Sequence, residues 1–422
     1  MGRVIRRCRH HLYHGCHPLA QEVVASWVGI TQAQLSRIEN GNAIVHLDRL
    51  IHWAQILGIP GQYLWFALPD RSPTNETEDV KRRLFLTTTS ASLAGALVGR
   101  VTPPSPAPPS DLARAMLTPS VSDTKPVPVA ELTKQVTTAW HLRQRASYEA
   151  LGQVLPTLLA QAQARVDTGD DAEQSSRVVV HAYNAASSLL RKLGDGPLAL
   201  VAADRAVGTA RALDDPVLIA AALYRLANVL LGAWRPDETK AVALQAADLI
   251  EPGKMQTPRS LAMWGGLLLT AAVAAARSAD ESAAWELLGE ARVAGRLLGA
   301  DRADIYSIFG PTNVAIHGVQ VAVELRRGAD AVRRSHHVDP DHLPPSLLER
   351  RGQFLIDVAH GHVLEGADTP AVAFLLRAND IAPQEVRLSP EVHDLIRTLL
   401  GRERIGATPG LRELARHIGF IE

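Results

Sequence analysis

The stretch QEVVASWVGITQAQLSRIENG, residues 21–41, decides the fold of the N-terminal part of this 422-residue chain. Small and apolar residues recur through 19–27, which predicts a first short helix. Gly29 then interrupts the pattern and can take the positive φ that a tight corner needs. A second helix is predicted over 32–40. The stretch therefore predicts two short helices joined by a tight turn.

The second helix has defined ends and two unlike faces. Thr31 suits its N-cap and Gln34 stands three residues later, as in a capping box. Gly41 is the residue type that ends a helix, and Leu35 and Ile38 face inward. The outward face is left with Gln32, Ala33, Ser36, Arg37 and Asn40. Amide, hydroxyl and guanidinium groups on one face suit DNA base edges and phosphates.

The stretch resembles the Xre-type helix-turn-helix domain of the lambdoid phage repressors and their bacterial relatives. The matching residues are Gln21, Ala25, Gly29, Thr31, Gln32, Leu35, Ile38, Glu39 and Gly41. The resemblance implies that Gln32, Ala33 and Arg37 reach base edges. It also implies contacts with the DNA backbone from Gln21, Thr31, Ser36 and Asn40. A helical hairpin inside a packed core is the alternative interpretation.

Glu39 departs from a role facing DNA, because phosphates repel its carboxylate. We expect it to pair with an arginine inside the domain or to cap the following loop.

The same resemblance implies a five-helix, lambda-repressor-like DNA-binding domain over residues 1–69. Three further helices are expected, over 2–11, 46–57 and 62–66. Residues 1–69 hold six arginines against three acidic residues, a net charge of +3, while the whole chain sums to zero. A basic end on a neutral chain fits a DNA-binding domain attached to a larger body.

Residues 70–130 are rich in Pro, Ser and Thr and predict a flexible linker. Inside it, KRRLFLTTTSASLAGALVG at 81–99 contains an apolar segment, 84–98. Its paired arginines resemble a twin-arginine export signal. The segment begins far from the N-terminus and is shorter than the roughly 20 residues that span a bilayer. A linker helix that docks on the body or on a partner is the favoured interpretation.

Residues 131–422 predict helix after helix and no strand. Segments rich in Ala and Leu recur in pairs about every 40–45 residues, which indicates a helical-hairpin solenoid and resembles tetratricopeptide repeats. A non-repeating helical domain is the alternative. The expected pairs are 178–193 with 197–213, 217–232 with 238–250, 260–276 with 281–298, 312–326 with 329–335, and 347–364 with 370–381.

The predicted fold class is therefore all-α: a DNA-binding domain, a linker and an α-solenoid. This layout resembles Xre-type regulators with a C-terminal tetratricopeptide-like domain, which are abundant in actinobacteria. Two segments, FGPTNVAIH at 309–317 and APQEVRLSPEV at 382–392, are similar to sequence segments typical of proteins in that group. The resemblance implies a transcriptional regulator and names no effector.

Polar and aromatic residues on the expected first helices, or beside them, form a candidate face for a ligand or partner, because concave solenoid surfaces bind peptides and other ligands. The alternative is that they brace packing between repeats. They are Arg177, Asn184, Tyr224, Asn228, Trp264, Tyr306, Asn313 and His317.

Two cysteines, Cys8 and Cys16, lie among four histidines in CRHHLYHGCH at 8–17. Their spacing matches no familiar zinc pattern, so we expect no metal and no cofactor. Two cysteines imply no disulfide scaffold, which favours a cytoplasmic protein. No phosphate loop, nucleophile elbow or zinc-protease motif occurs, so no enzyme is expected.

These expectations converge on a sequence-specific DNA-binding regulator of transcription. Its partners would be a double-stranded DNA operator, a second copy in a homodimer, and a peptide, small-molecule or protein effector on the repeats. No membrane partner is expected. A protein-interaction scaffold with a weak DNA anchor is the main alternative, and an antitoxin of Xre type is a third.

Overall fold

The computed structural model describes residues 6, 20–27, 30–40, 53, 110–117, 127–167, 171–253, 257–403 and 406–421. The chain divides into two compact units, Met1–Gly99 and Arg100–Glu422. The helices expected over 2–11, 46–57 and 62–66 lie outside the described residues, apart from Arg6 and Trp53, which are helical. The segment 81–99 and both cysteines also lie outside them.

In the first unit, the two predicted helices are confirmed as α2 (Gln21–Trp27) and α3 (Gln32–Glu39). The capping box is present: Gln34 N donates to Thr31 Oγ1 (3.3 Å), and Thr31 N donates to Gln34 Oε1 (3.0 Å). Leu35 and Ile38 are buried, as their spacing predicted. The box satisfies two backbone N–H groups that would otherwise lack partners at the helix start.

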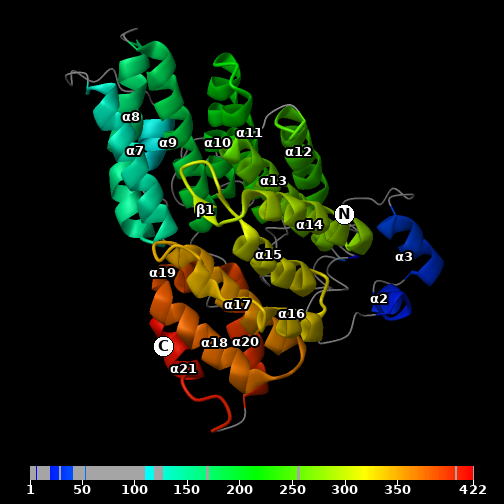
Figure 1. The fold of residues 1–422 in the computed structure, drawn as a ribbon. Helices are drawn as coiled ribbons and strands as arrows, with labels where there is room; N and C mark the ends of the chain where they lie inside the picture. The colour runs from blue at the N-terminus through cyan, green and yellow to red at the C-terminus, as the bar shows by residue number, and fades with distance from the viewer. Residues whose placement is uncertain are drawn as a thin grey trace, which may run out of the picture. The chain divides into compact units, whose positions relative to one another are not determined.

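The second unit is a succession of helical hairpins (Figure 1). The first helix of each hairpin packs on the first helix of the next. The six pairs are α7 (Val129–Gln144) with α8 (Tyr148–Asp167), α9 (Ala172–Lys192) with α10 (Gly196–Ala212), α11 (Pro216–Gly232) with α12 (Pro236–Leu249), α13 (Pro258–Arg277) with α14 (Glu281–Leu298), α15 (Pro311–Glu324) with α16 (Gly328–Ser335), and α17 (Leu348–Leu364) with α18 (Asp368–Ile381). The five pairs expected from the sequence are thus confirmed.

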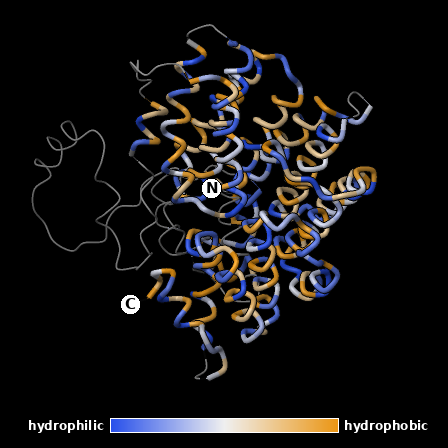
Figure 2. Tube along the Cα trace, turned by 60° about the vertical axis from the view of Figure 1, so that its left-hand side comes forward, coloured by the Kyte–Doolittle hydropathy of each residue, from blue (hydrophilic) through white to orange (hydrophobic). Residues whose placement is uncertain are grey.

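After the hairpins come α19 (Pro383–Leu388), α20 (Pro390–Arg402) and α21 (Leu411–His417), and a short 3-10 helix, Pro340–His342, precedes α17. Along the helices, Figure 2 shows hydrophobic and hydrophilic residues alternating, as expected of helices with one buried face. The buried faces carry much Ala, for example Ala203, Ala227 and Ala291, each 0% exposed. Small side chains let neighbouring helices approach closely.

The two helices of most hairpins are joined by a tight turn in which one residue adopts the left-handed backbone conformation. In two of the turns this residue is a glycine, Gly194 (φ 82°) or Gly366 (φ 71°). Trp234, Ala279 and Arg326 take φ of 57–62° at the equivalent places, where a side chain costs some strain. Because the turns share this geometry, successive hairpins fold back in a similar way.

Two expectations need correction. The stretch expected to be a flexible linker contains a helix, α6 (Ser110–Leu117), whose Leu112 and Met116 are fully buried against the repeats. The region expected to have no strand contains a short antiparallel hairpin, β1 (Arg302–Ala303) with β2 (Ile308–Phe309). Both depend on contacts with distant residues, which local periodicity does not reveal.

The β-hairpin is anchored on α13 by an aromatic ring. Phe309 of β2 is 0% exposed and lies directly against Gly265. A Cβ atom at Gly265 would stand 2.0 Å from Cζ of Phe309, so the ring occupies the space that any other residue needs. Glycine is therefore required at this close approach.

The substitution Gly265→Ala should destabilise the protein by about 1–3 kcal/mol, because the new methyl group would push Phe309 out of its site. Gly289→Ala on α14 is the matched control: no atom lies within 4 Å of its added Cβ, so we expect a gain of about 0.5–1 kcal/mol. Denaturant unfolding measures both. Equal stability of the two variants would contradict this packing.

One helix of the described residues, α13, has the length and apolar composition of a membrane span. Its apolar window is 83% buried inside the repeats. The helix therefore serves as a core element of this unit.

Candidate functional sites

The outward face of α3 is the first candidate site. Gln32, Ala33, Arg37 and Asn40 are exposed and Ser36 is half-buried. The face predicted for base and phosphate contacts is thus open to solvent. Contact of these residues with DNA stays a prediction.

Glu39 faces inward, as expected. One of its partners is Gln21, whereas an arginine or the following loop was expected. Its Oε2 accepts a hydrogen bond from Nε2 of Gln21 (2.7 Å), and Glu39 is only 3% exposed. The bond ties α2 to α3. The Gln21 amide has a second N–H donor, and its contact with the DNA backbone stays a prediction.

In the repeat unit, a buried ionic network joins the first hairpins to the last. Arg143 at the end of α7 makes a two-pronged ion pair with Glu349 of α17, both contacts at 3.4 Å. Lys192 of α9 contacts Glu349 (3.3 Å) and also bonds Glu385 of α19. Tyr148 donates to Glu385. Figure 1 shows α19 beside the lower ends of α7 and α9.

The electrostatics of this network favour the charged form of Glu349. Burial alone raises the pKa of Glu349, but Arg143 and Lys192 outweigh it and hold that pKa well below its ordinary value. Burial raises the pKa of Tyr148, and the charge of Glu385 adds to that effect, so the phenol remains a hydrogen-bond donor. Arg143 also donates to Ser188 Oγ (2.9 Å).

Glu349→Gln should lower the free energy of unfolding at pH 7 by about 3–5 kcal/mol, because it leaves the buried Arg143 without the carboxylate of its ion pair, while Lys192 keeps Glu385. A depressed folded-state pKa contributes stability above the unfolded-state value, about 4.3, and that contribution is lost as pH falls towards the folded-state pKa. The wild type should therefore lose more stability than Glu349→Gln between pH 6 and pH 3.

Denaturant unfolding at several pH values measures this difference. Glu290→Gln, on an exposed position of α14, is the matched control and should leave stability within about 0.5 kcal/mol. Parallel pH profiles for the wild type and Glu349→Gln would show that Glu349 has no part in acid sensitivity.

A cationic cavity of about 420 Å³ lies where the N-terminal ends of α9, α11 and α13 meet the β-hairpin. We call it the arginine cavity. Its lining carries three guanidinium groups and one carboxylate. The lining residues are Arg177, Asp215, Val217, Thr257, Pro258, Arg259, Arg302 and Tyr306.

The hairpin that carries Tyr306 is tied to the interior of the repeats. The Tyr306 carbonyl oxygen accepts from Nη2 of Arg225 (3.0 Å). Arg225 lies over the ring of Trp140 on α7, 4.5 Å from its centroid. Burial lowers the pKa of Arg225 to about 10, so it remains a cation at neutral pH. The arginine cavity is therefore connected through Arg225 to the first helix of the repeats.

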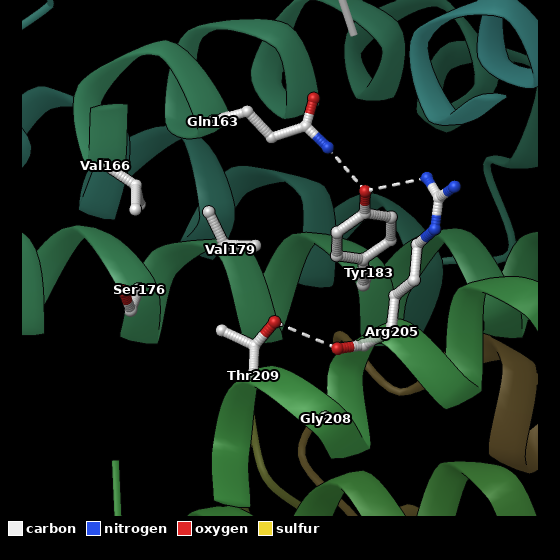
Figure 3. A pocket seen from close by; sticks show the side chains of 8 residues that line it. All are labelled: Gln163, Val166, Ser176, Val179, Tyr183, Arg205, Gly208 and Thr209. Atoms are coloured by element: carbon white, nitrogen blue, oxygen red, sulfur yellow. Dashed lines mark hydrogen bonds between the residues drawn. The ribbon is translucent and has the colours of Figure 1, made fainter. Parts of the chain in front are cut away.

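A second cavity, also of about 420 Å³, lies between α8, α9 and α10. Figure 3 shows Gln163 and Arg205 pointing towards the hydroxyl of Tyr183, and both donate to it. Arg205 also donates to the carbonyl oxygen of Met116 at the end of α6. This cavity therefore adjoins the docked linker helix.

Several residues of the predicted ligand face have partners within the repeats. Asn313 donates to the Ile308 carbonyl (2.9 Å), and His317 Nδ1 lies 2.8 Å from the Asn313 carbonyl oxygen. Burial, with nearby Arg350, lowers the pKa of His317 to about 3, so it is neutral. Asn228 donates to the Tyr224 carbonyl of its own helix (2.8 Å).

Asn184 and Trp264 take other positions. Asn184 is 2% exposed, and its side-chain oxygen has no hydrogen-bond partner among the described residues. Trp264 is half-buried against the aliphatic core. The structure brings Tyr306 and Arg177 together in the arginine cavity and does not gather the whole predicted set there. Ligand contact by any of these residues stays a prediction.

Sequence reasoning missed Arg259, Arg302 and the ionic network. Arg302 lies between the expected helices 281–298 and 312–326, and Arg143 and Glu349 lie 206 positions apart. No local pattern marks such residues as neighbours. Within the described part of the chain, no group of three His, Cys, Asp or Glu residues could hold a metal ion.

Comparison with known proteins gives distant structural similarity only. No family model and no curated protein matches the sequence. The fold is similar to a Rap protein solved with competence and sporulation factor: TM-score 0.41, 12% identity, 69% of this chain and 88% of that one. It is also similar to Bacillus thuringiensis PlcR solved with the peptide PapR7 and DNA: TM-score 0.30, 15% identity, 71% and 95%. Similarity this low assigns neither family nor function.

Proposed function

We propose that the protein is a sequence-specific DNA-binding regulator of transcription. The observation that carries the proposal is α3, which begins at a complete capping box and presents Gln32, Ala33 and Arg37 on one exposed face. An amide pairs with adenine and a guanidinium with guanine, each good pair contributing about 1–3 kcal/mol of discrimination. One short helix makes few such contacts, so we propose a homodimer on two half-sites.

The repeat unit is the proposed sensor for a peptide, small-molecule or protein effector in the cytoplasm. Two cavities of effector size support this role, since ligand sites commonly measure about 300–1,000 Å³. The docked helix α6 supplies a physical link, because it continues the linker from the DNA-binding unit and contacts α8. No nucleophile, metal or cofactor chemistry enters the proposal.

Selection of bound duplexes from a random pool should enrich a palindromic motif with the intact protein. The double variant Gln32→Ala/Arg37→Ala should lose that enrichment, because it removes the two side chains proposed to read bases. Losing two such contacts costs about 2–6 kcal/mol of discrimination, or roughly 30-fold or more. The spacing of the motif's halves gives the arrangement of the two DNA-binding units.

Gln245→Ala/Arg296→Ala is the matched control, since it removes the same residue types from exposed sites on the repeats. It should enrich the wild-type motif. No enrichment with the wild type at moderate salt would favour the scaffold alternative. Enrichment that survives Gln32→Ala/Arg37→Ala would remove α3 as the reading helix.

A further inference from the structure

The arginine cavity has guanidinium groups with unused donors. Arg177 is engaged with Asp215 (2.5 Å) and Glu173 (3.2 Å). Arg259 makes only a loose contact with Asp304 (3.6 Å), and its side chain is 55% exposed. Arg302 is exposed and makes no ion pair among the described residues. Each guanidinium has five N–H donors in a planar fork, so Arg259 and Arg302 keep most of theirs for a ligand.

The helix ends around the cavity add to its preference for negative charge. At the start of α11, Asp215 already fills the anionic position and accepts from the N–H groups of Val217 and Leu218. At the start of α13, the cap is the neutral Thr257, and no acidic residue occupies the first turn. The positive end of the dipole of this 20-residue helix therefore has no counter-charge from its own first turn.

Tyr306 provides a neutral donor and an apolar wall. Burial raises the pKa of Tyr306, so its hydroxyl is protonated at neutral pH. That hydroxyl has no hydrogen-bond partner among the described residues. Two side chains contact the ring: His181 packs against it edge-on, 4.8 Å between centroids, and the Arg259 guanidinium lies 4.7 Å from its centroid.

We propose that the arginine cavity binds an oxyanion, a carboxylate or phosphate group, of a small organic ligand. Arg259 and Arg302 hold its oxygens through paired N–H donors, the Tyr306 hydroxyl donates to it, and Arg177 adds positive charge from the wall. The volume of about 420 Å³ exceeds that of a lone anion. The organic part of the ligand then lies against Tyr306, Pro258 and Val217. This inference rests on the proposed effector-sensing role and specifies its chemistry.

The second cavity is less suited to an anion. Its one arginine, Arg205, already donates to the Tyr183 hydroxyl and to the Met116 carbonyl (Figure 3). Its walls also include Val166 and Val179. Anion binding by the repeats is therefore assigned to the arginine cavity.

Isothermal titration calorimetry of the full chain, with sodium phosphate and with trisodium citrate, tests the proposal. A Tris chloride buffer at constant ionic strength avoids competing oxyanions. At least one probe should bind the wild type, and Arg259→Ala and Arg302→Ala should each raise its Kd about tenfold or more, since each removes charge-assisted hydrogen bonds. Binding of phosphate alone identifies a phosphate site, and binding of citrate alone a carboxylate site.

Arg296→Ala, an exposed arginine on α14, is the matched control and should keep the wild-type Kd. Arg302→Lys keeps the charge without the fork and should bind with intermediate affinity. Thermal melts verify folding, and the glutamine variant of the same position, Arg259→Gln or Arg302→Gln, replaces an alanine variant that melts early. Absence of binding of either probe to the wild type, or equal Kd values in all variants, would overturn the proposal. DNA is absent from this assay, so its failure is distinct from a failure of DNA recognition.

Discussion

The pairing of Arg143 with Glu349 is the interaction on which the shape of the repeat unit depends. In a simple solenoid, each hairpin contacts only its neighbours, and stability is roughly a sum of local terms. Here α17 returns to contact α7, and Glu349 meets Arg143 and Lys192 from the first two hairpins. Separating the two ends would leave buried charges without partners, which is strongly unfavourable. The network therefore makes residues far apart in the chain depend on one another.

This closure also fixes the surroundings of the arginine cavity. Two contacts hold the hairpin that carries Tyr306 and Arg302. Phe309 packs against Gly265 of α13, and Arg225 of α11 donates to the Tyr306 carbonyl. Arg225 in turn lies over Trp140, one turn before Arg143 on α7. A rigid frame of this kind keeps cationic side chains at the cavity although they repel one another.

The end of the linker belongs physically to the repeat unit. Leu112 and Met116 are buried against it, and Arg205 donates to the Met116 carbonyl. A change in the packing of α8 and α10 would thus act directly on α6, from which the chain leads back towards the first unit. Helix α6 therefore couples this end of the linker to the packing of the repeats.

Features that depend on neighbours along the chain could be predicted from local patterns of residues. Periodicity placed five helical hairpins, and Thr31 with Gln34 placed the start of α3. The polar residue types of α3 also predicted its exposed face. The docking of α6, the ionic network and the arginine cavity could be recognised only in the folded chain, because each joins residues distant in sequence. The β-hairpin is local, but its position depends on Gly265 and Arg225 of other helices. The partners of a polar side chain such as Arg143 are likewise set by the packing of whole helices rather than by the residues beside it.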